Sequence, residues 1–224
     1  MGNIIIYMYS SPDWFFGYSI FMELFFMLII LAVSYYSLKV YKLTGQRQAK
    51  LFSLAFLFIA AAYLVQSLFS LSIIYSLNQV VSDALRIIGV NTFNMTIFFL
   101  RSTFFLSGLV TLTYMTFKES SKKAYSLILI LVFFSMILSW NRAYTFYLFS
   151  SIFLIYIASY YLVNYLKKKR LNTLLVLIAF IFLLFGSIHF IFSVNHALFY
   201  VIGHFLELIA YILILINLIL VIKK

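Results

Sequence analysis

Seven long apolar stretches, separated only by short polar loops, constrain the fold of this chain more than any other feature. They occupy residues 14–38, 51–77, 87–117, 125–140, 144–166, 171–194 and 198–222. A helix needs about 20 predominantly apolar residues to cross the hydrocarbon core of a bilayer. The strands of a membrane β-barrel are shorter and alternate apolar with polar residues, which these stretches do not. The sequence therefore predicts an all-α, polytopic bundle of seven transmembrane helices, forming a single domain over residues 1–224.

The fourth stretch is the shortest, and the polar residues around it define it. Lys122 and Lys123 precede it, and Asn141 and Arg142 follow it. Without that second polar pair, the apolar run between residues 120 and 167 would be too long for one helix. We therefore expect two separate helices in this run.

Composition excludes a soluble protein. Charged residues make up 9% of the 224 residues and hydrophobic residues 66%, whereas a soluble domain carries about 25% charged residues. Intrinsic disorder is excluded as well, because it requires low hydrophobicity. Cysteine is absent, so no disulfide, thiol nucleophile or cysteine-ligated metal is expected. The richness in Ile, Phe, Tyr, Lys and Asn is typical of an AT-rich prokaryotic genome.

The basic residues indicate the orientation of the chain. A net charge of +11 would suggest nucleic-acid binding in a soluble protein. Here, however, 13 of the 16 basic residues lie in alternate loops or at the C-terminal end, and so on one face of the membrane. The positive-inside rule places that face and the C-terminus in the cytoplasm, and the N-terminus outside. We predict a multi-pass protein of the cell membrane that binds no nucleic acid.

One basic run is a candidate contact for anionic lipid. It consists of Lys167, Lys168, Lys169 and Arg170. Clusters of basic residues next to a spanning helix attract anionic headgroups. The positive-inside rule also accounts for this run through topology alone.

A few polar side chains interrupt the apolar stretches, and they are the candidate ligand-binding residues. They are Glu23, Gln66, Asn94, Arg101, His189, His204, Glu207 and Tyr211. Ionisable groups inside a bilayer are costly and usually face the interior of a bundle. Counted from the predicted outer ends at 1.5 Å per residue, most of these residues lie in the outer half of the bilayer.

Helical spacing places several of these residues on common faces. Tyr200, His204, Glu207 and Tyr211 recur at intervals of four, three and four residues, which gives one stripe on the last helix. Asn94, Arg101 and Gly108 are each seven apart and share a face of the third helix. Gly186 and Gly203 are small enough to let two helices approach closely.

Arg101 allows two interpretations of this set. Its side chain stays charged, so it needs a carboxylate, and Glu207 and Glu23 are the intramembrane candidates. In the structural interpretation, an Arg101–Glu207 or Arg101–Glu23 pair fixes helix register. In the interpretation that we favour, the residues form a ligand site that opens outward. Two carboxylates, two histidines and a glutamine exceed what one arginine needs.

Several chemistries stay open for such a site. His189 and His204 could be the axial ligands of a haem, and together with Glu207 they are the candidate metal ligands. His204 and Glu207 could relay protons in a transporter or channel, or the polar groups could only hold together a structural subunit. No catalytic residue is predicted, since the apolar stretches contain no Asp for a Ser–His–Asp triad.

The last apolar stretch also resembles a known family. Residues 203–211, with the sequence Gly-His-Phe-Leu-Glu-Leu-Ile-Ala-Tyr, are similar to the last helix of seven-helix membrane sensor modules in prokaryotic signalling proteins. These modules are the MASE-type domains and the N-terminal regions of seven-helix histidine kinases. The resemblance implies a receptor or sensor. Since the sequence contains no kinase, cyclase or coiled-coil segment, we expect it to act through a membrane or cytoplasmic signalling partner.

Overall fold

The described part of the protein is entirely helical. The computed structural model describes residues 12–77, 83–117, 121–193 and 196–222, and among these residues it contains no strand. A 3-10 helix at Asp13–Phe15 precedes seven α-helices. They are α1 (Phe16–Thr44), α2 (Arg47–Leu77), α3 (Asp83–Thr116), α4 (Lys122–Leu138), α5 (Arg142–Lys168), α6 (Leu171–Phe192) and α7 (Ala197–Ile222). The predicted all-α fold is confirmed, with one helix in each predicted stretch.

Six of these helices are long and apolar enough to cross a membrane, as expected of a multi-pass membrane protein. The exception is α4, which has 17 residues. At 1.5 Å per residue it is about 25 Å long, shorter than the roughly 30 Å hydrocarbon core. A transmembrane α4, the predicted single domain and the orientation of the two termini therefore stay predictions.

Local polar residues end and begin the helices where the sequence suggested. Asn141 caps the N-terminus of α5, because its Oδ1 atom accepts a hydrogen bond from the Tyr144 N–H group over 3.1 Å. This cap separates α4 from α5 at the predicted place. Gly45 ends α1 in a left-handed conformation with φ of 67°, which glycine adopts without strain. The chain then needs only two residues to turn from α1 into α2.

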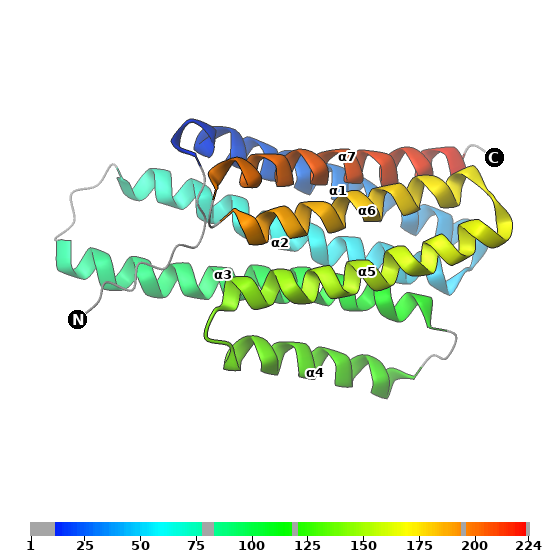
Figure 1. Ribbon diagram of the computed structural model, residues 1–224, viewed down its shortest axis with the longest axis horizontal. Coiled ribbons are helices and arrows are strands. Elements are labelled where there is room, and N and C mark those ends of the chain that lie inside the picture. Colours follow the sequence, from blue (N-terminus) through cyan, green and yellow to red (C-terminus); the bar gives the residue numbers. More distant parts are fainter. Residues whose placement is uncertain (1–11, 78–82, 118–120, 194–195, 223–224) are drawn as a thin grey trace. The chain divides into compact units, whose positions relative to one another are not determined.

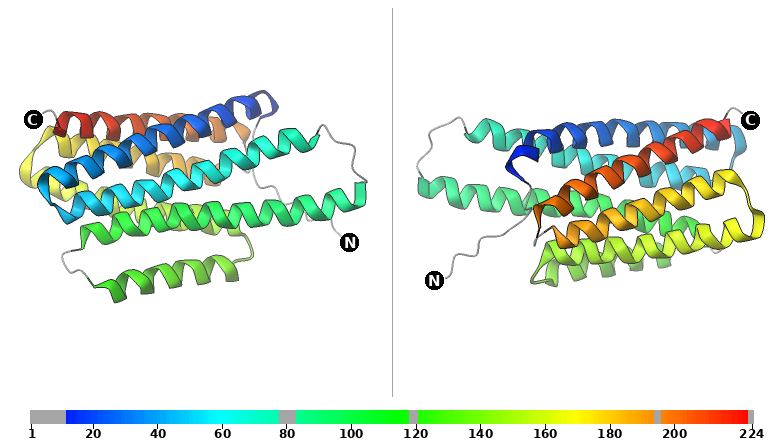
Figure 2. Two further views of the ribbon diagram at one scale, coloured as in Figure 1. Left: turned by 180° about the vertical axis from the view of Figure 1, so that it is seen from behind. Right: turned by 45° about the horizontal axis from the view of Figure 1, so that its top comes forward.

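The chain divides into two compact units, which are described separately. The α1–α3 unit comprises Ile20–Leu129, and the α5–α7 unit comprises Met1–Ser19 together with Ile130–Lys224. In the first unit α1, α2 and α3 run side by side in alternating directions (Figure 2). In the second, α6 packs against both α5 and α7 (Figure 1).

Serine hydroxyls join α1 to α2. The Oγ atom of Ser34 donates to the Ser53 carbonyl over 2.9 Å, and the Oγ atom of Ser53 donates back to the Ser34 carbonyl over 2.8 Å. Nearer the turn, the Ser37 hydroxyl donates to the Ala49 carbonyl over 2.9 Å. Small side chains with one hydroxyl suit helix pairing in lipid, because they permit close approach and their hydroxyl groups donate hydrogen bonds to the backbone of the neighbouring helix.

Glycines set the closest helix contacts in both units. A Cβ atom at Gly108 of α3 would lie 2.6 Å from Cγ1 of Ile59 and 2.8 Å from the Ala55 carbonyl oxygen of α2. A Cβ atom at Gly186 of α6 would lie 3.2 Å from the carbonyl oxygen of Gly203 on α7. The expected close approach at Gly186 and Gly203 is thus confirmed.

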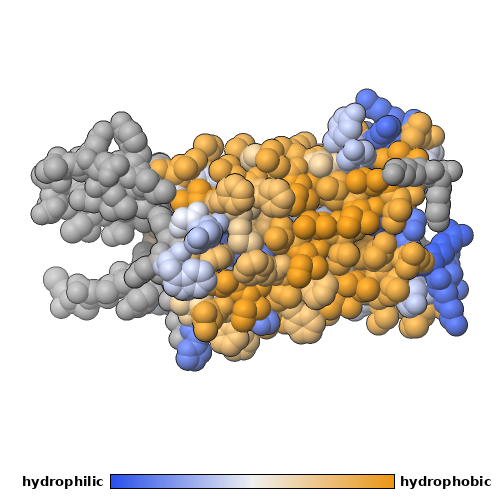
Figure 3. Space-filling model, turned by 90° about the horizontal axis from the view of Figure 1, so that it is seen from above, coloured by the Kyte–Doolittle hydropathy of each residue, from blue (hydrophilic) through white to orange (hydrophobic). Residues whose placement is uncertain are grey.

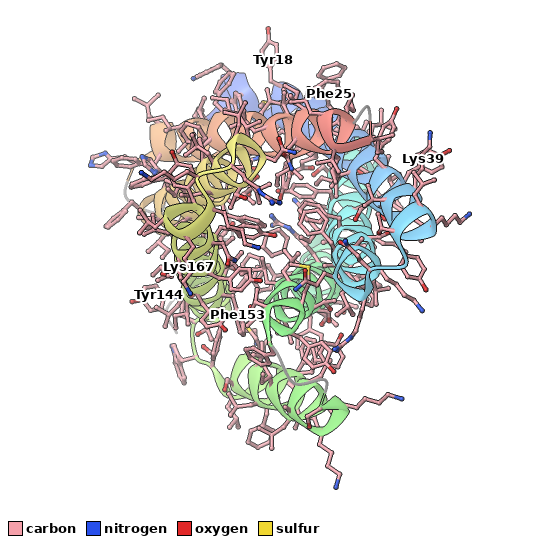
Figure 4. The ribbon with its side chains drawn as sticks, turned by 90° about the vertical axis from the view of Figure 1, so that its right-hand side faces the viewer. Tyr18, Phe25, Lys39, Tyr144, Phe153 and Lys167 are labelled. Carbon is pink, nitrogen blue, oxygen red and sulfur yellow. The ribbon has the colours of Figure 1, made fainter. Side chains whose placement is uncertain are left out.

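The outer faces of the helices are apolar. On α4, Val132 and Met136 are buried, whereas residues such as Ile130 (68% exposed) project away. In Figure 3 hydrophobic residues cover the helix faces, and hydrophilic residues gather toward helix ends. Tyr18 and Phe25 of α1, both exposed, point away from its packed side (Figure 4). Surfaces of this kind fit contact with the acyl chains of a bilayer.

The close contact at Gly108 leads to a testable prediction about stability. Gly108→Ala should lower the stability of the detergent-solubilised protein by about 1–2 kcal/mol, because the added methyl group overlaps α2 backbone and forces the helices apart. Thermal unfolding measures the effect. Gly17→Ala is the matched control, since a Cβ atom there meets nothing within 4 Å. Equal midpoints for the two variants would contradict the proposed α2–α3 contact.

Candidate functional site

Five of the predicted ligand-binding residues are buried in two clusters, one in each unit. The Glu23 cluster of the α1–α3 unit consists of Glu23, Gln66, Ser70 and Arg101. The His204 cluster of the α5–α7 unit consists of Phe15, Phe190, Tyr200, His204 and Glu207. Every one of these side chains is at most 9% exposed.

Three helices contribute to the Glu23 cluster. Glu23 lies on α1, and the Ser70 hydroxyl of α2 donates to its Oε2 atom over 3.1 Å. Gln66, one turn before Ser70, also hydrogen-bonds the Glu23 carboxyl group through its side chain. Arg101 of α3 lies close enough to attract the same group electrostatically. Glu23 is therefore bound from α2 and charge-compensated from α3.

Helical periodicity places each of these groups. Glu23 shares the packed side of α1 with Phe26 and Ile30, which are also buried. Arg101 precedes Gly108 by two turns, and this face of α3 is the one that approaches α2. The predicted shared face is confirmed for Arg101 and Gly108, whereas the side chain of Asn94 lies outside the described residues.

Of the two expected carboxylate partners of Arg101, Glu23 is the one whose interaction the α1–α3 unit shows. Arg101 and Glu207 belong to different units, and their pairing stays a prediction. This electrostatic attraction fits the structural interpretation for this part of the candidate set, in which Arg101 and Glu23 fix helix register.

Aromatic rings enclose His204 in the other cluster. The imidazole centroid lies 4.3 Å from the ring of Tyr200, 5.2 Å from Phe190 and 5.8 Å from Phe15. Its Nδ1 atom is 2.9 Å from the Tyr200 carbonyl oxygen. Because a carbonyl only accepts, Nδ1 carries the proton and donates it.

The stripe predicted on the last helix is confirmed. Tyr200, His204, Glu207 and Tyr211 are all buried on α7. Glu207 passes close to α6 at Gly186, where its Cγ atom would lie 3.4 Å from an added Cβ atom. That distance is an ordinary van der Waals contact, so Glu207 packs directly against the α6 backbone at this position.

His189 has other surroundings. It is half-buried on α6, its Nδ1 atom donates to the Phe185 carbonyl over 2.7 Å, and its ring lies 5.5 Å from that of Phe199. These contacts do not bring it to His204, so they give no support to a haem held between the two histidines. Within the described ranges, no three His, Asp or Glu side chains are grouped closely enough to hold a metal ion.

Some members of the clusters were not expected from the sequence. Ser70 had a signal, because it follows Gln66 by four residues. Phe15 and Phe190 had none, since 27 phenylalanines are spread through the chain. Asn217 is a further residue of interest on α7, because it is 7% exposed and its Oδ1 atom lacks a hydrogen-bond partner among the described residues.

Comparison of the chain with protein-family models, with curated proteins and with solved structures found no match.

The Glu23 cluster predicts a large effect on stability. Glu23→Gln should destabilise the protein by about 3–5 kcal/mol, because it leaves the Arg101 charge in hydrocarbon without this carboxylate. Unfolding in detergent, by heat or by sodium dodecyl sulfate, measures the change. Ser70→Ala is the matched control and should cost about 1 kcal/mol, the worth of one hydrogen bond.

A double variant tests the pairing itself. Glu23→Leu combined with Arg101→Leu should recover most of the loss caused by either change alone, since replacing both charges with apolar groups removes the desolvation penalty. Additive losses would contradict the pairing of Glu23 with Arg101.

Substitution of Asn217 is expected to stabilise the protein, in contrast to the substitutions above. Asn217→Leu should raise the midpoint of thermal unfolding by an amount equivalent to about 1–3 kcal/mol, because it removes a buried amide oxygen that lacks a partner. Leu and Asn share the same branching and number of side-chain heavy atoms, so the new side chain follows the same path among its neighbours. A lowered midpoint would show instead that the amide makes an important contact.

Proposed function

We propose that this protein is a membrane receptor or sensor whose ligand binds at the His204 cluster. The observation that supports the proposal is the combination of an aromatic-enclosed imidazole with a buried carboxylate one turn further along the same face of α7. The resemblance of residues 203–211 to the last helix of membrane sensor modules points in the same direction.

The two clusters differ in the groups that surround their ionisable side chains. An ionisable side chain near the middle of a bilayer costs about 2.5–3.5 kcal/mol. In the Glu23 cluster that cost is offset by partners on α2 and α3, so the cluster contributes to the fold. The His204 cluster places a second carboxylate and an imidazole on one face of α7, beside aromatic rings that would form the walls of a ligand site.

The chemistry of the His204 cluster defines the ligand class. Nε2 of His204 can accept or donate one hydrogen bond, and the Glu207 carboxylate accepts. The rings of Phe15, Phe190 and Tyr200 provide flat apolar walls and attract positive charge. A small ligand with an apolar body and an amine or hydroxyl group matches these properties.

Helix packing would transmit the binding event. The ligand would lie where α6 and α7 approach most closely, at Gly186 and Gly203. Closely packed helices move as rigid bodies, because a displacement at one point of the contact is transmitted along the whole helix. A displacement of α7 against α6 would then reach the cytoplasmic ends, where a membrane or cytoplasmic signalling partner reads it.

Co-purification tests the proposal. The wild type, isolated in a mild detergent from its own membranes, should retain a small molecule that native mass spectrometry detects. His204→Ala should lose that molecule, because the imidazole contact disappears, whereas His189→Ala should keep it, because His189 lies against Phe199 outside the cluster. If the wild type carries no small molecule while His204→Ala folds normally, the polar groups of α7 serve packing alone and the receptor proposal is wrong.

A further inference from the structure

A second polar surface lies at the end of the α1–α3 unit where α1 turns into α2. It contains four exposed basic residues, which we call the hairpin patch. They are Lys39, Lys42, Arg47 and Lys50. No acidic residue occurs between positions 39 and 50. The side chain of Lys39 extends away from α1 (Figure 4).

The backbone of the hairpin holds the four residues together. Gly45 and Gln46 alone connect the two helices, and the Gly45 N–H group donates to the Tyr41 carbonyl over 2.8 Å. On the other side of the turn, Ser37 bonds to the Ala49 carbonyl. The ends of α1 and α2 are thus fixed relative to each other, so the backbone holds the four basic residues at one end of the unit.

Two of the cations lie on tyrosine rings. The Arg47 guanidinium carbon is 5.1 Å from the ring centroid of Tyr114 on α3, and the Lys50 Nζ atom is 5.7 Å from that of Tyr41 on α1. A ring contact uses the face of the guanidinium, whereas its N–H donors lie along the edge. The contact with Tyr114 therefore leaves the edge of the Arg47 guanidinium group for other partners.

The length of α1 places this patch at the depth of lipid headgroups. With 29 residues the helix is about 43 Å long, whereas the hydrocarbon core measures about 30 Å. Its last turns extend beyond the acyl chains. Tyrosines at this level are typical of the membrane–water interface.

We propose that the hairpin patch is a binding site for the phosphate group of anionic phospholipids. The guanidinium group of Arg47 would donate two parallel hydrogen bonds to two phosphate oxygens. Lys50, one turn further along α2, would contribute the second positive charge. The site does not depend on the His204 cluster and belongs to a different unit of the chain.

The basic run at residues 167–170 lacks this construction. Among the described residues, none of its four cations makes a contact with an aromatic ring, and Lys169 occupies a left-handed conformation with φ of 44°. We infer that this run acts through its net charge on topology. It therefore serves as a matched control for the hairpin patch.

Lipid binding to the full-length protein tests the proposal. The protein is reconstituted in nanodiscs of phosphatidylcholine, alone or mixed with phosphatidylglycerol, and bound phospholipid is counted by native mass spectrometry after release. Arg47→Gln combined with Lys50→Gln should bind phosphatidylglycerol roughly 10- to 30-fold more weakly, since each basic residue contributes about a fivefold change in affinity. Lys167→Gln combined with Lys168→Gln removes the same charge and should bind as the wild type does.

Each outcome decides the question. Equal loss in both double variants would show a general charge effect and overturn the proposal, as would undiminished binding by the Arg47/Lys50 variant. Since both replaced residues are exposed, a thermal midpoint equal to that of the wild type in pure phosphatidylcholine verifies folding. Adding inorganic phosphate to the discs that contain phosphatidylglycerol distinguishes the source, because displacement of the lipid by the free ion at equal concentration would assign the patch to phosphate rather than to lipid.

Discussion

Hydrocarbon offers no hydrogen-bond partner, and the organisation of this protein follows from that constraint. Each backbone N–H and C=O group has to be satisfied within its own segment, which leaves helices as the structure for long apolar stretches. Side chains obey the same rule. Ser34 and Ser53 exchange hydrogen bonds across the contact of α1 with α2, and Ser37 bonds to the backbone of α2. Hydrophobic burial does not drive these contacts, because lipid is as apolar as the helix faces.

Close packing and polar pairing support each other in this environment. Gly108 lets the backbone of α3 approach α2, and the same face of α3 carries Arg101 toward the Glu23 carboxyl group, which Gln66 and Ser70 also contact. A larger residue at position 108 would separate the helices and weaken the electrostatic contact. The small residue and the charged residue on this face of α3 thus serve two contacts, because Gly108 meets the backbone of α2 and Arg101 attracts Glu23 of α1.

Periodicity accounts for what could be predicted from the sequence. The seven helices, the shared face of Arg101 and Gly108, the α7 stripe and the close approach at Gly186 and Gly203 all depend on residues along one helix or on the smallness of a side chain. Partners on other helices were not accessible in this way. The sequence alone did not show whether Glu23 or Glu207 pairs with Arg101. It also did not distinguish Phe15 and Phe190 from the many other phenylalanines as neighbours of His204. Lipid-facing and packed phenylalanines look alike in sequence, because both surroundings are apolar.

Aromatic rings contact basic side chains in both units of this protein. At the α1–α2 turn, Tyr114 and Tyr41 support the cations of Arg47 and Lys50. Around His204, the rings of Phe15, Phe190 and Tyr200 enclose an imidazole. A ring face attracts positive charge through its quadrupole, yet it costs nothing to bury in an apolar medium. A carboxylate could perform the first task only by adding another charge that has to be desolvated. In a chain with 5 acidic and 45 Phe and Tyr residues, aromatic rings are the more abundant neighbours for basic side chains, and both proposed binding sites contain them.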